Sequence, residues 1–227
     1  MAAPDRNGLW SVPFFRAPPE AVGWQIEMAD IDAKTVMALR KRSGAPMMDC
    51  KKALQEADGD MEKAVDLLRK KGLQSADKKA SRDANEGLIF NYNHHDGKLG
   101  VLAEVACETD FVARNEDFQA FGRDLCLHVA AMAPRYLNRE DVSSEDIEKE
   151  RNFQLEKAAE QMAGKPEEVV EKAVEGRMKK FFAESCLMDQ AWVKDDSLTV
   201  EEVRKNLVGT IGENIQVRRF FRLQLGG

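Results

Sequence analysis

Cysteine is scarce in this sequence, and long apolar runs are missing. Four cysteines occur in 227 residues, none in a CxxC spacing, so the pattern matches neither a zinc site nor the dense disulfide frame of a small secreted domain. No segment approaches the roughly 18 consecutive apolar residues that a membrane helix requires. This use of cysteine favours a reducing cytoplasm, and we expect no association with a membrane.

Phosphate-binding motifs are missing as well. Neither GxxxxGK[ST] nor GxGxxG occurs, so we do not expect the chain to hold nucleotide phosphates. Of the three histidines, His94 and His95 are adjacent, and neighbouring side chains of an extended chain face opposite ways, which makes a shared metal site awkward. His128 follows the apolar face of a predicted helix, and we interpret it as a satisfied, partly buried core residue. We therefore predict no metal and no cofactor.

Nucleophiles and acid–base groups give little support to an enzyme. Cys107 lies beside Glu108, whose charge would raise the thiol pKa, and its strand of small apolar residues indicates a core position. Glu104, Glu108 and Asp110 lie close together and could suggest general acid–base work, with His128 completing a hydrolase site. No cationic or sugar-binding residues accompany them. We expect no catalytic residues and no enzymatic activity.

Acidic residues outnumber basic ones. The net charge of −6 disfavours non-specific binding of nucleic acid. Residues 63–82 are an exception, with seven lysines and arginines. Nucleic-acid readers usually add stacking aromatic side chains, and this stretch has none. We interpret it as a solvated helix face and expect no direct contact with nucleic acid.

The first 27 residues differ from the rest of the chain. Four prolines interrupt any helix, and the aromatic residues follow no clear period. The charged start and apolar run of a secretory signal are missing, and three acidic residues argue against an organellar transit peptide. The helical pattern begins just after Met28. We therefore expect residues 1–27 to be a disordered extension, or to precede a natural start at Met28.

Residues 28–73 contain three short helical patterns separated by tight breaks. The first ends at Gly44, a residue suited to a left-handed helix end, and Pro46 then opens the second. Asp60 is a ready N-cap for the third pattern, which we expect to end at Gly72. Three such helices predict a compact bundle of the ubiquitin-associated type, and these bundles usually serve as docking modules. The polar residues 74–86 follow as an exposed helix or a linker.

Residues 87–227 show first strand and then helix patterns. Alternating apolar residues on both sides of a His-His-Asp-Gly turn predict a hairpin, with a loop longer than two residues. A helix that Pro134 ends comes next, followed by a charged helix from 144 to about 162 and a helix that starts at Pro166. Thr199 and Glu202 have the spacing of a capping box for a further helix that reaches Gly212.

The closing run 215–225 is expected to be a half-buried strand that pairs with the hairpin. Its apolar residues alternate with polar ones, namely Ile215, Val217, Phe221, Leu223 and Leu225. Helices packed on a small antiparallel sheet define an α+β domain. The predicted architecture is therefore a three-helix bundle followed by an α+β core.

The corner at 108–115 carries an aromatic residue between a carboxylate and the entry to a helix. Asp110 and Asn115 can each bond backbone amides at a turn, which would stiffen the tip. Phe111 either caps the core of its own domain or faces outward. On the residues alone, the first interpretation is favoured.

Three segments resemble the elongation factor Ts family. The run LRKRSGAPMMDCKKAL at 39–54 looks like its N-terminal signature, and EVACETDFVARN at 104–115 resembles its second signature. IGENI at 211–215 and RRF at 218–220 are similar to its closing segment. The resemblance spans residues 28–227 in the family's order. It implies a guanine-nucleotide exchange factor for elongation factor Tu, the GTPase that carries aminoacyl-tRNA to the ribosome.

The resemblance also assigns residues. It implies that the three-helix module docks on the GTPase domain of the partner, through Arg40, Met47, Met48 and Asp49. A second group matches the family segment that displaces Mg²⁺ from the partner's nucleotide site, namely Thr109, Asp110, Phe111 and Val112. Asp110 and Phe111 form its tip. The resemblance thus reverses the interpretation of Phe111, which becomes a partner-facing wedge.

One departure from the family concerns size. Longer members carry a second core subdomain and a coiled-coil hairpin, whereas this chain has room for one three-stranded sheet. It resembles the short form, in which two chains supply the sheets, so we expect a homodimer that packs through the exposed face of the last strand, with Phe220 on it. The alternative is a docking scaffold whose three-helix module binds a ubiquitin-like or RNA partner without exchange activity.

Overall fold

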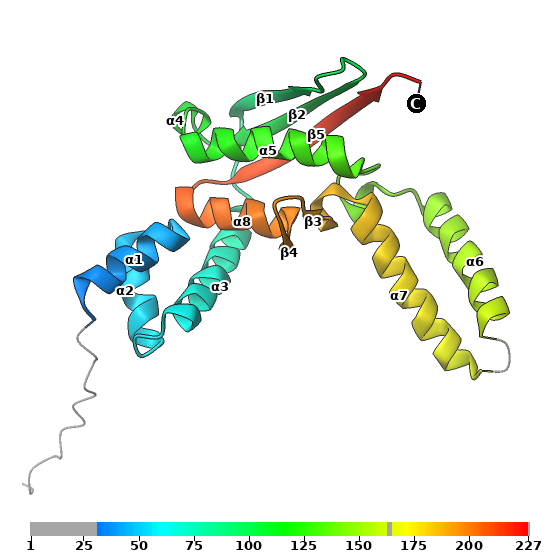
Figure 1. Cartoon of the computed structure of the whole chain (residues 1–227), viewed down its shortest axis with the longest axis horizontal. Coiled ribbons are helices and arrows are strands. Elements are labelled where there is room, and N and C mark those ends of the chain that lie inside the picture. Colours follow the sequence, from blue (N-terminus) through cyan, green and yellow to red (C-terminus); the bar gives the residue numbers. More distant parts are fainter. Residues whose placement is uncertain (1–30, 163–164, 227) are drawn as a thin grey trace, which may run out of the picture. The chain divides into compact units, whose positions relative to one another are not determined.

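The computed structural model describes residues 31–162 and 165–226, and Figure 1 shows the order of their elements. The predicted extension at 1–27 lies outside the described residues. The helices are α1 (Ala33–Ser43), α2 (Met47–Glu56), α3 (Met61–Lys79), α4 (Asp110–Ala113), α5 (Glu116–Met132), α6 (Ser144–Gln161), α7 (Glu167–Ser185) and α8 (Val200–Ile211). The strands are β1 (Glu86–Asn93), β2 (Leu99–Cys107), β3 (Ala191–Trp192), β4 (Asp195–Thr199) and β5 (Ile215–Gln224). This combination confirms the predicted α+β class.

The first three helices form a small bundle with its own core. Asp32 and Asp60 cap α1 and α3 with their side chains, and Gly44 ends α1 in the left-handed conformation, with φ 67°. The fully buried side chains at the centre are Leu39, Cys50 and Leu54. The bundle thus forms as the sequence predicts. Aspartate N-caps begin α1 and α3, a left-handed glycine ends α1, and Pro46 precedes α2.

The third helix does not end at Gly72, and this corrects the expected boundary. It continues through most of the polar stretch to Lys79. A glycine inside a helix costs about 1 kcal/mol of helix stability relative to alanine. From the local sequence alone, Gly72 therefore favoured an end of the helix. Here α3 packs along α8: Ala76 is 2% exposed, and Asp77 forms an ion pair with Lys205 at 2.7 Å. These tertiary contacts extend the helix beyond the point where its own sequence favours an end.

A three-stranded antiparallel sheet in the order β1-β2-β5 forms the centre of the α+β part. Both predicted pairings are confirmed, the β1–β2 hairpin and the pairing of the last strand with it. Helix α5 packs against β1 and β2 (Figure 1). Its buried face meets the inward side chains of the strands, chiefly Phe118, Leu125 and Val129 against Phe90, Ala103 and Val105. One face of the sheet is thereby covered.

The last strand contains a β-bulge that the alternating pattern did not predict. Val105 lies opposite Val217, whereas Glu104 lies opposite Arg219, so Arg218 is an extra residue without a partner in the ladder. The bulge exchanges the two faces of the strand beyond it. Phe220 consequently packs on the core, and the prediction that it lies on the exposed face is wrong.

Beyond the bulge, the exposed residues of β5 include Phe221 and Leu223, which the alternating pattern had placed among the apolar residues of a half-buried strand. Phe221 is 58% exposed and Leu223 76%. They lie on the outer face of the sheet, where Phe221 is opposite Leu102. We call this the outer sheet face, and its exposed apolar side chains are Ile89, Leu102, Phe221, Leu223 and Leu225.

Two further parts complete the fold. Helices α6 and α7, both predicted, pack against each other (Figure 1). The small hairpin β3–β4 was not predicted, because strands of two and five residues show no usable alternation. It places Trp192, 6% exposed, against Phe121 and His128. None of the helices within residues 31–162 and 165–226 is long and apolar enough to cross a membrane.

Candidate functional site

The corner after β2 is a single helical turn held between two caps. Thr109 caps α4, its hydroxyl accepting a hydrogen bond from the Val112 amide. Asn115 then caps α5, accepting from Asp117 N at 2.8 Å and Phe118 N at 3.3 Å, as expected for this residue. With caps on both sides the turn has little conformational freedom. We call residues 109–112 the corner loop.

Phe111 points away from the protein. Its side chain is 79% exposed, while its neighbours Val112 and Ala113 are 8% and 6% exposed. The corner therefore caps the core through Val112, and the interpretation of Phe111 as a core residue is wrong. Exposing a phenylalanine to this degree forgoes about 1.5–3 kcal/mol of burial. Within the corner loop Asp110 and Phe111 are exposed, Thr109 is half-buried and Val112 is buried.

Asp110 has a different partner from the one expected. Its carboxylate accepts from Arg114 Nη2 at 2.9 Å, one helical turn away, and within residues 31–162 and 165–226 no backbone amide bonds to it. Both side chains are at least half exposed, so the pair adds little stability. Asp110 and Arg114 are instead free to exchange this contact for another.

The corner loop is anchored from behind by the start of the closing segment. The carboxylate of Glu213 accepts two hydrogen bonds from Thr109, from its amide at 3.0 Å and from its hydroxyl at 2.8 Å. Next to it, the backbone amide of Asn214 donates a hydrogen bond to the Glu108 carboxylate at 2.6 Å. Sequence reasoning did not assign a role to Glu213. The available signal was the segment 211–215, which was used only for the family resemblance.

The carboxylates near the corner do not form an acid–base cluster. Glu104 pairs with Arg219 at 2.6 Å on the outer sheet face, and Glu108 bonds the Asn214 amide. Cys107 is buried, as predicted. Burial raises the pKa of the Cys107 thiol to about 11, with the charge of Glu213 as the next cause. The expected effect of Glu108 is not among the causes. The thiol is therefore a poor nucleophile.

The histidines are placed as structural residues. His128 is fully buried: its Nε2 lies 2.9 Å from Gln190 Oε1, and Val193 N donates to its Nδ1 at 3.2 Å. The expectation of a satisfied core histidine is confirmed. Burial lowers the pKa of His128. The rings of His94 and His95 lie 4.3 Å apart rather than on opposite sides, because the chain has already left the strand. In the described part of the chain no three His, Cys, Asp or Glu side chains gather as metal ligands would.

Comparison with known proteins places this arrangement in a family. A sequence model described as elongation factor TS matches residues 75–206. The elongation factor Ts of Geobacter metallireducens is 53% identical over 196 residues, which cover 86% of this chain and 90% of that protein. The elongation factor Ts of Fervidobacterium nodosum is 49% identical over 197 residues, 87% of this chain and 99% of the relative. The chain belongs to the elongation factor Ts family. The resemblance drawn from the three sequence segments is thereby confirmed.

In this elongation factor Ts family member, the predicted docking residues all lie on the surface of the bundle. Arg40 is in the last turn of α1, and Met47, Met48 and Asp49 form the first turn of α2. Met48 is 62% exposed, and so is Met37, which precedes Arg40 by three residues on α1. Residues three apart share a helix face, so Met37 adds to the same surface. Exposed methionines suit protein contacts because their side chains adapt to the partner.

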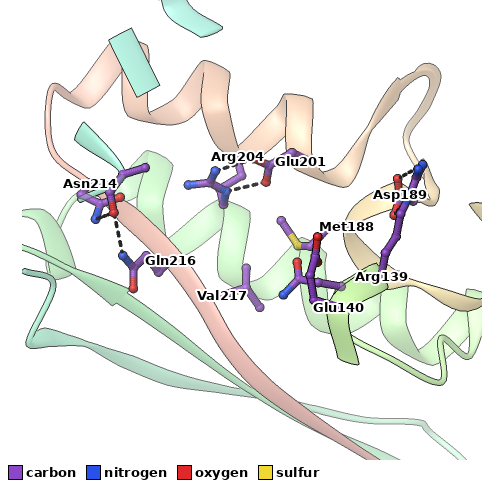
Figure 2. A pocket seen from close by; sticks show the side chains of 11 residues that line it. Arg139, Glu140, Met188, Asp189, Glu201, Arg204, Asn214, Gln216 and Val217 are labelled. Carbon is purple, nitrogen blue, oxygen red and sulfur yellow. Dashed lines mark hydrogen bonds and ion pairs between the residues drawn. The ribbon is translucent and has the colours of Figure 1, made fainter. Parts of the chain in front are cut away.

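A polar cavity of about 430 Å³ lies beside α8 and the start of β5 (Figure 2). Four of its five charged side chains are paired, Arg204 with Glu201 and Arg139 with Asp189, each at 2.6 Å. No residue of the corner loop lines it. The N-terminal signature, by contrast, borders a second cavity of about 750 Å³ through Arg42, Pro46 and Asp49. The corner loop lines neither cavity and presents Phe111 to solvent, which suits contact with a protein better than the enclosure of a small molecule.

Proposed function

We propose that this chain is a guanine-nucleotide exchange factor for elongation factor Tu, and that it acts without covalent chemistry. The observation that supports this most is Phe111, an almost fully exposed aromatic side chain on a doubly capped turn. To insert between helices or strands of a partner, an apolar ring must project from a backbone with little conformational freedom, as Phe111 does. Family membership supplies the partner.

The division of work follows from the two surfaces. The bundle docks on the GTPase through Arg40, Met47, Met48 and Asp49, and the corner loop enters near the nucleotide. Phe111 shifts elements that hold Mg²⁺ and the β-phosphate, while Asp110 brings a negative charge to the same place. Loss of the metal removes much of the charge compensation of the phosphates, so GDP leaves faster.

Linkage sets the size of this effect. The factor and the nucleotide each bind the GTPase, and the factor weakens nucleotide binding by the same free energy by which the nucleotide weakens binding of the factor. A coupling of about 5 kcal/mol corresponds to roughly 10⁴-fold in nucleotide affinity. GTP then reloads the site and expels the factor by the same coupling.

Release of fluorescent GDP from elongation factor Tu tests the proposal. The wild-type chain should accelerate release, and Phe111→Ala should remove most of the acceleration. Phe153 on α6 is exposed to 55% and gives a matched control, since Phe153→Ala should leave the rate unchanged. A wild-type chain that does not change release would favour the docking scaffold, with a ubiquitin-like or RNA partner on the bundle. If Phe111→Ala accelerates GDP release as much as wild type does, the exchange function stands but Phe111 is not needed for it.

We also propose that the chain forms a homodimer through the outer sheet face. The outer sheet face carries five exposed apolar side chains and faces away from the core. A sheet face with this many exposed apolar side chains is stabilised when a second layer buries it. Two copies related by a two-fold axis would cover both faces at once. Light scattering at micromolar concentration should then give twice the chain mass of 25.5 kDa.

A further inference from the structure

Helices α3 and α8 approach each other closely at a pair of glycines. A Cβ atom on Gly209 of α8 would lie 2.9 Å from the Cα atom of Gly72 in α3, closer than real Cβ contacts come. A Cβ atom on Gly72 would meet Asn206 Oδ1 at 3.8 Å, an ordinary contact. The close approach therefore depends on the missing side chain of Gly209 and only weakly on that of Gly72.

Two ion pairs accompany the glycine contact, formed by α3 residues on both sides of Gly72 and by α8 residues that both precede Gly209. Arg69 binds Glu202 at 2.9 Å, and Asp77 binds Lys205 at 2.7 Å. The side chains of Arg69, Glu202 and Lys205 are partly covered, whereas Asp77 is 62% exposed, and the pairs lie at different heights along α3. Together with the backbone contact at Gly209, the two pairs resist sliding and rotation of one helix on the other. The bundle is thus tied to α8 through α3.

The C-terminal end of α8 is also tied to the corner loop. Gly212 ends the helix in the left-handed conformation, with φ 92°, and the chain turns so that Glu213 reaches Thr109 with both carboxylate oxygens. The Glu213 carboxylate bonds the residue that caps the Phe111 turn. One helix therefore connects the docking surface of the bundle to the support of Phe111.

We propose that α8 is a positioning element, in which Gly209 sets the place of the bundle and Glu213 sets the place of Phe111. This inference rests on the proposed exchange function. Two linked contacts on one partner strengthen each other only when the geometry allows both at once. A shift at Gly209 or at Glu213 allows the bundle to dock while Phe111 misses its target. Gly209 and Glu213 lie outside the corner loop, and in this proposal they act by placing Phe111.

Two alanine variants at the glycine pair test the first part. Gly209→Ala should lower the maximal rate of GDP release at saturating factor by about tenfold or more, because the linked contact is lost. Gly72→Ala makes the same change in the same helix pair without the clash, so it should stay within about twofold of wild type. Equal rates for both variants and wild type overturn the role of the crossing. Equal losses overturn it too, because they point to general damage.

A double-mutant cycle tests the second part. Glu213→Gln should lower the maximal release rate about tenfold in the wild-type background and have no further effect in Phe111→Ala, because it acts through that ring. Independent losses in both backgrounds contradict a positioning role.

Amide hydrogen exchange on the free chain separates this inference from the exchange function. Glu213→Gln should speed exchange at the Thr109 amide roughly tenfold while α5 stays protected, since a charge-assisted hydrogen bond is weakened. Unchanged protection overturns the anchoring of the loop. Faster exchange with an unchanged release rate overturns the coupling to Phe111. A wild-type chain inactive in GDP release removes the proposed function, and Thr109 protection still decides whether Glu213 holds the loop.

Discussion

Phe220 and Phe221 are adjacent in β5, yet they belong to opposite sides of the sheet. Phe220 lies opposite Ala103 and packs on the core, whereas Phe221 lies opposite Leu102 and is 58% exposed. The extra residue at Arg218 causes this assignment, because without the bulge the two rings would exchange faces. The bulge thereby gathers apolar side chains on the outer sheet face.

Phe221→Ser should convert the proposed dimer into a monomer. In a two-fold interface the substitution occurs twice, and each buried phenylalanine contributes about 1.5–3 kcal/mol, so dimer affinity should fall by roughly 10² or more. Light scattering over a dilution series measures the shift. Phe153→Ser on α6 removes an equally exposed ring, at 55%, and should leave the dimer intact. A dimer that survives Phe221→Ser places the interface elsewhere.

Elements with strong local signals could be predicted from the sequence, and those set by distant contacts could not. The Thr199–Glu202 capping box, the turn at 94–97 and the Pro166 helix start all lie where the pattern indicated. The extension of α3 beyond Gly72 depends on α8, more than a hundred residues later. The bulge at Arg218 depends on how β5 meets β2 and leaves no mark in an alternating run.

The candidate site shows the same division at the level of single residues. In a helical turn successive side chains differ by about 100°, so either Phe111 or Val112 could face the core of a one-turn helix. The caps at Thr109 and Asn115 decide between them, and the structure turns Val112 inward. Glu213 bonds Thr109 across 104 positions of sequence, a pairing that no local pattern contains.

Gly122→Ala should destabilise the fold. Gly122 lies in α5 directly against the Phe90 ring, which a Cβ atom would overlap. Overpacking of this kind costs about 1–3 kcal/mol, and the Tm should fall by roughly 2–4 °C for each kcal/mol. Gly176 in α7 is the control, because nothing lies within 4 Å of its Cβ position. Gly176→Ala should raise the Tm through helix propensity alone. A thermal melt in which both variants shift in the same direction contradicts this account.

The four thiols should be inert until the protein unfolds. All four cysteines are buried, and burial raises the pKa of Cys126 and Cys186, like that of Cys107, to about 11. At pH 8 such a thiol is thiolate to only about 10⁻³, and the thiolate is the reactive form. An aromatic disulfide reagent should therefore titrate four thiols in urea and almost none in buffer. Lys149→Cys, at a side chain 67% exposed, should add one fast-reacting thiol in buffer. Rapid native reaction of the wild type would contradict the buried positions.

Stability should fall as the pH drops below about 6.5, and His128 should account for part of the loss. Burial lowers the pKa of His128 in the folded protein below the usual 6.5. The unfolded chain therefore takes up the proton first, and each pH unit between the two pKa values costs up to about 1.4 kcal/mol. In addition to burial, the folded state disfavours the protonated ring because Nδ1 accepts a hydrogen bond from Val193 N, and a proton on Nδ1 would remove that acceptor. Above pH 6.5 this group should contribute no slope.

Urea unfolding from pH 5 to pH 8 measures this slope. His128→Gln removes the titrating group while an amide can still accept from Val193 and bond Gln190, so the variant should lose stability less steeply toward pH 5 than wild type does. His95→Gln changes the exposed histidine of the β1–β2 turn and should keep the wild-type steepness. If His128→Gln and wild type run parallel over the whole range, the acid sensitivity arises from the carboxylates, and the pKa of His128 is the same in the folded and unfolded chains.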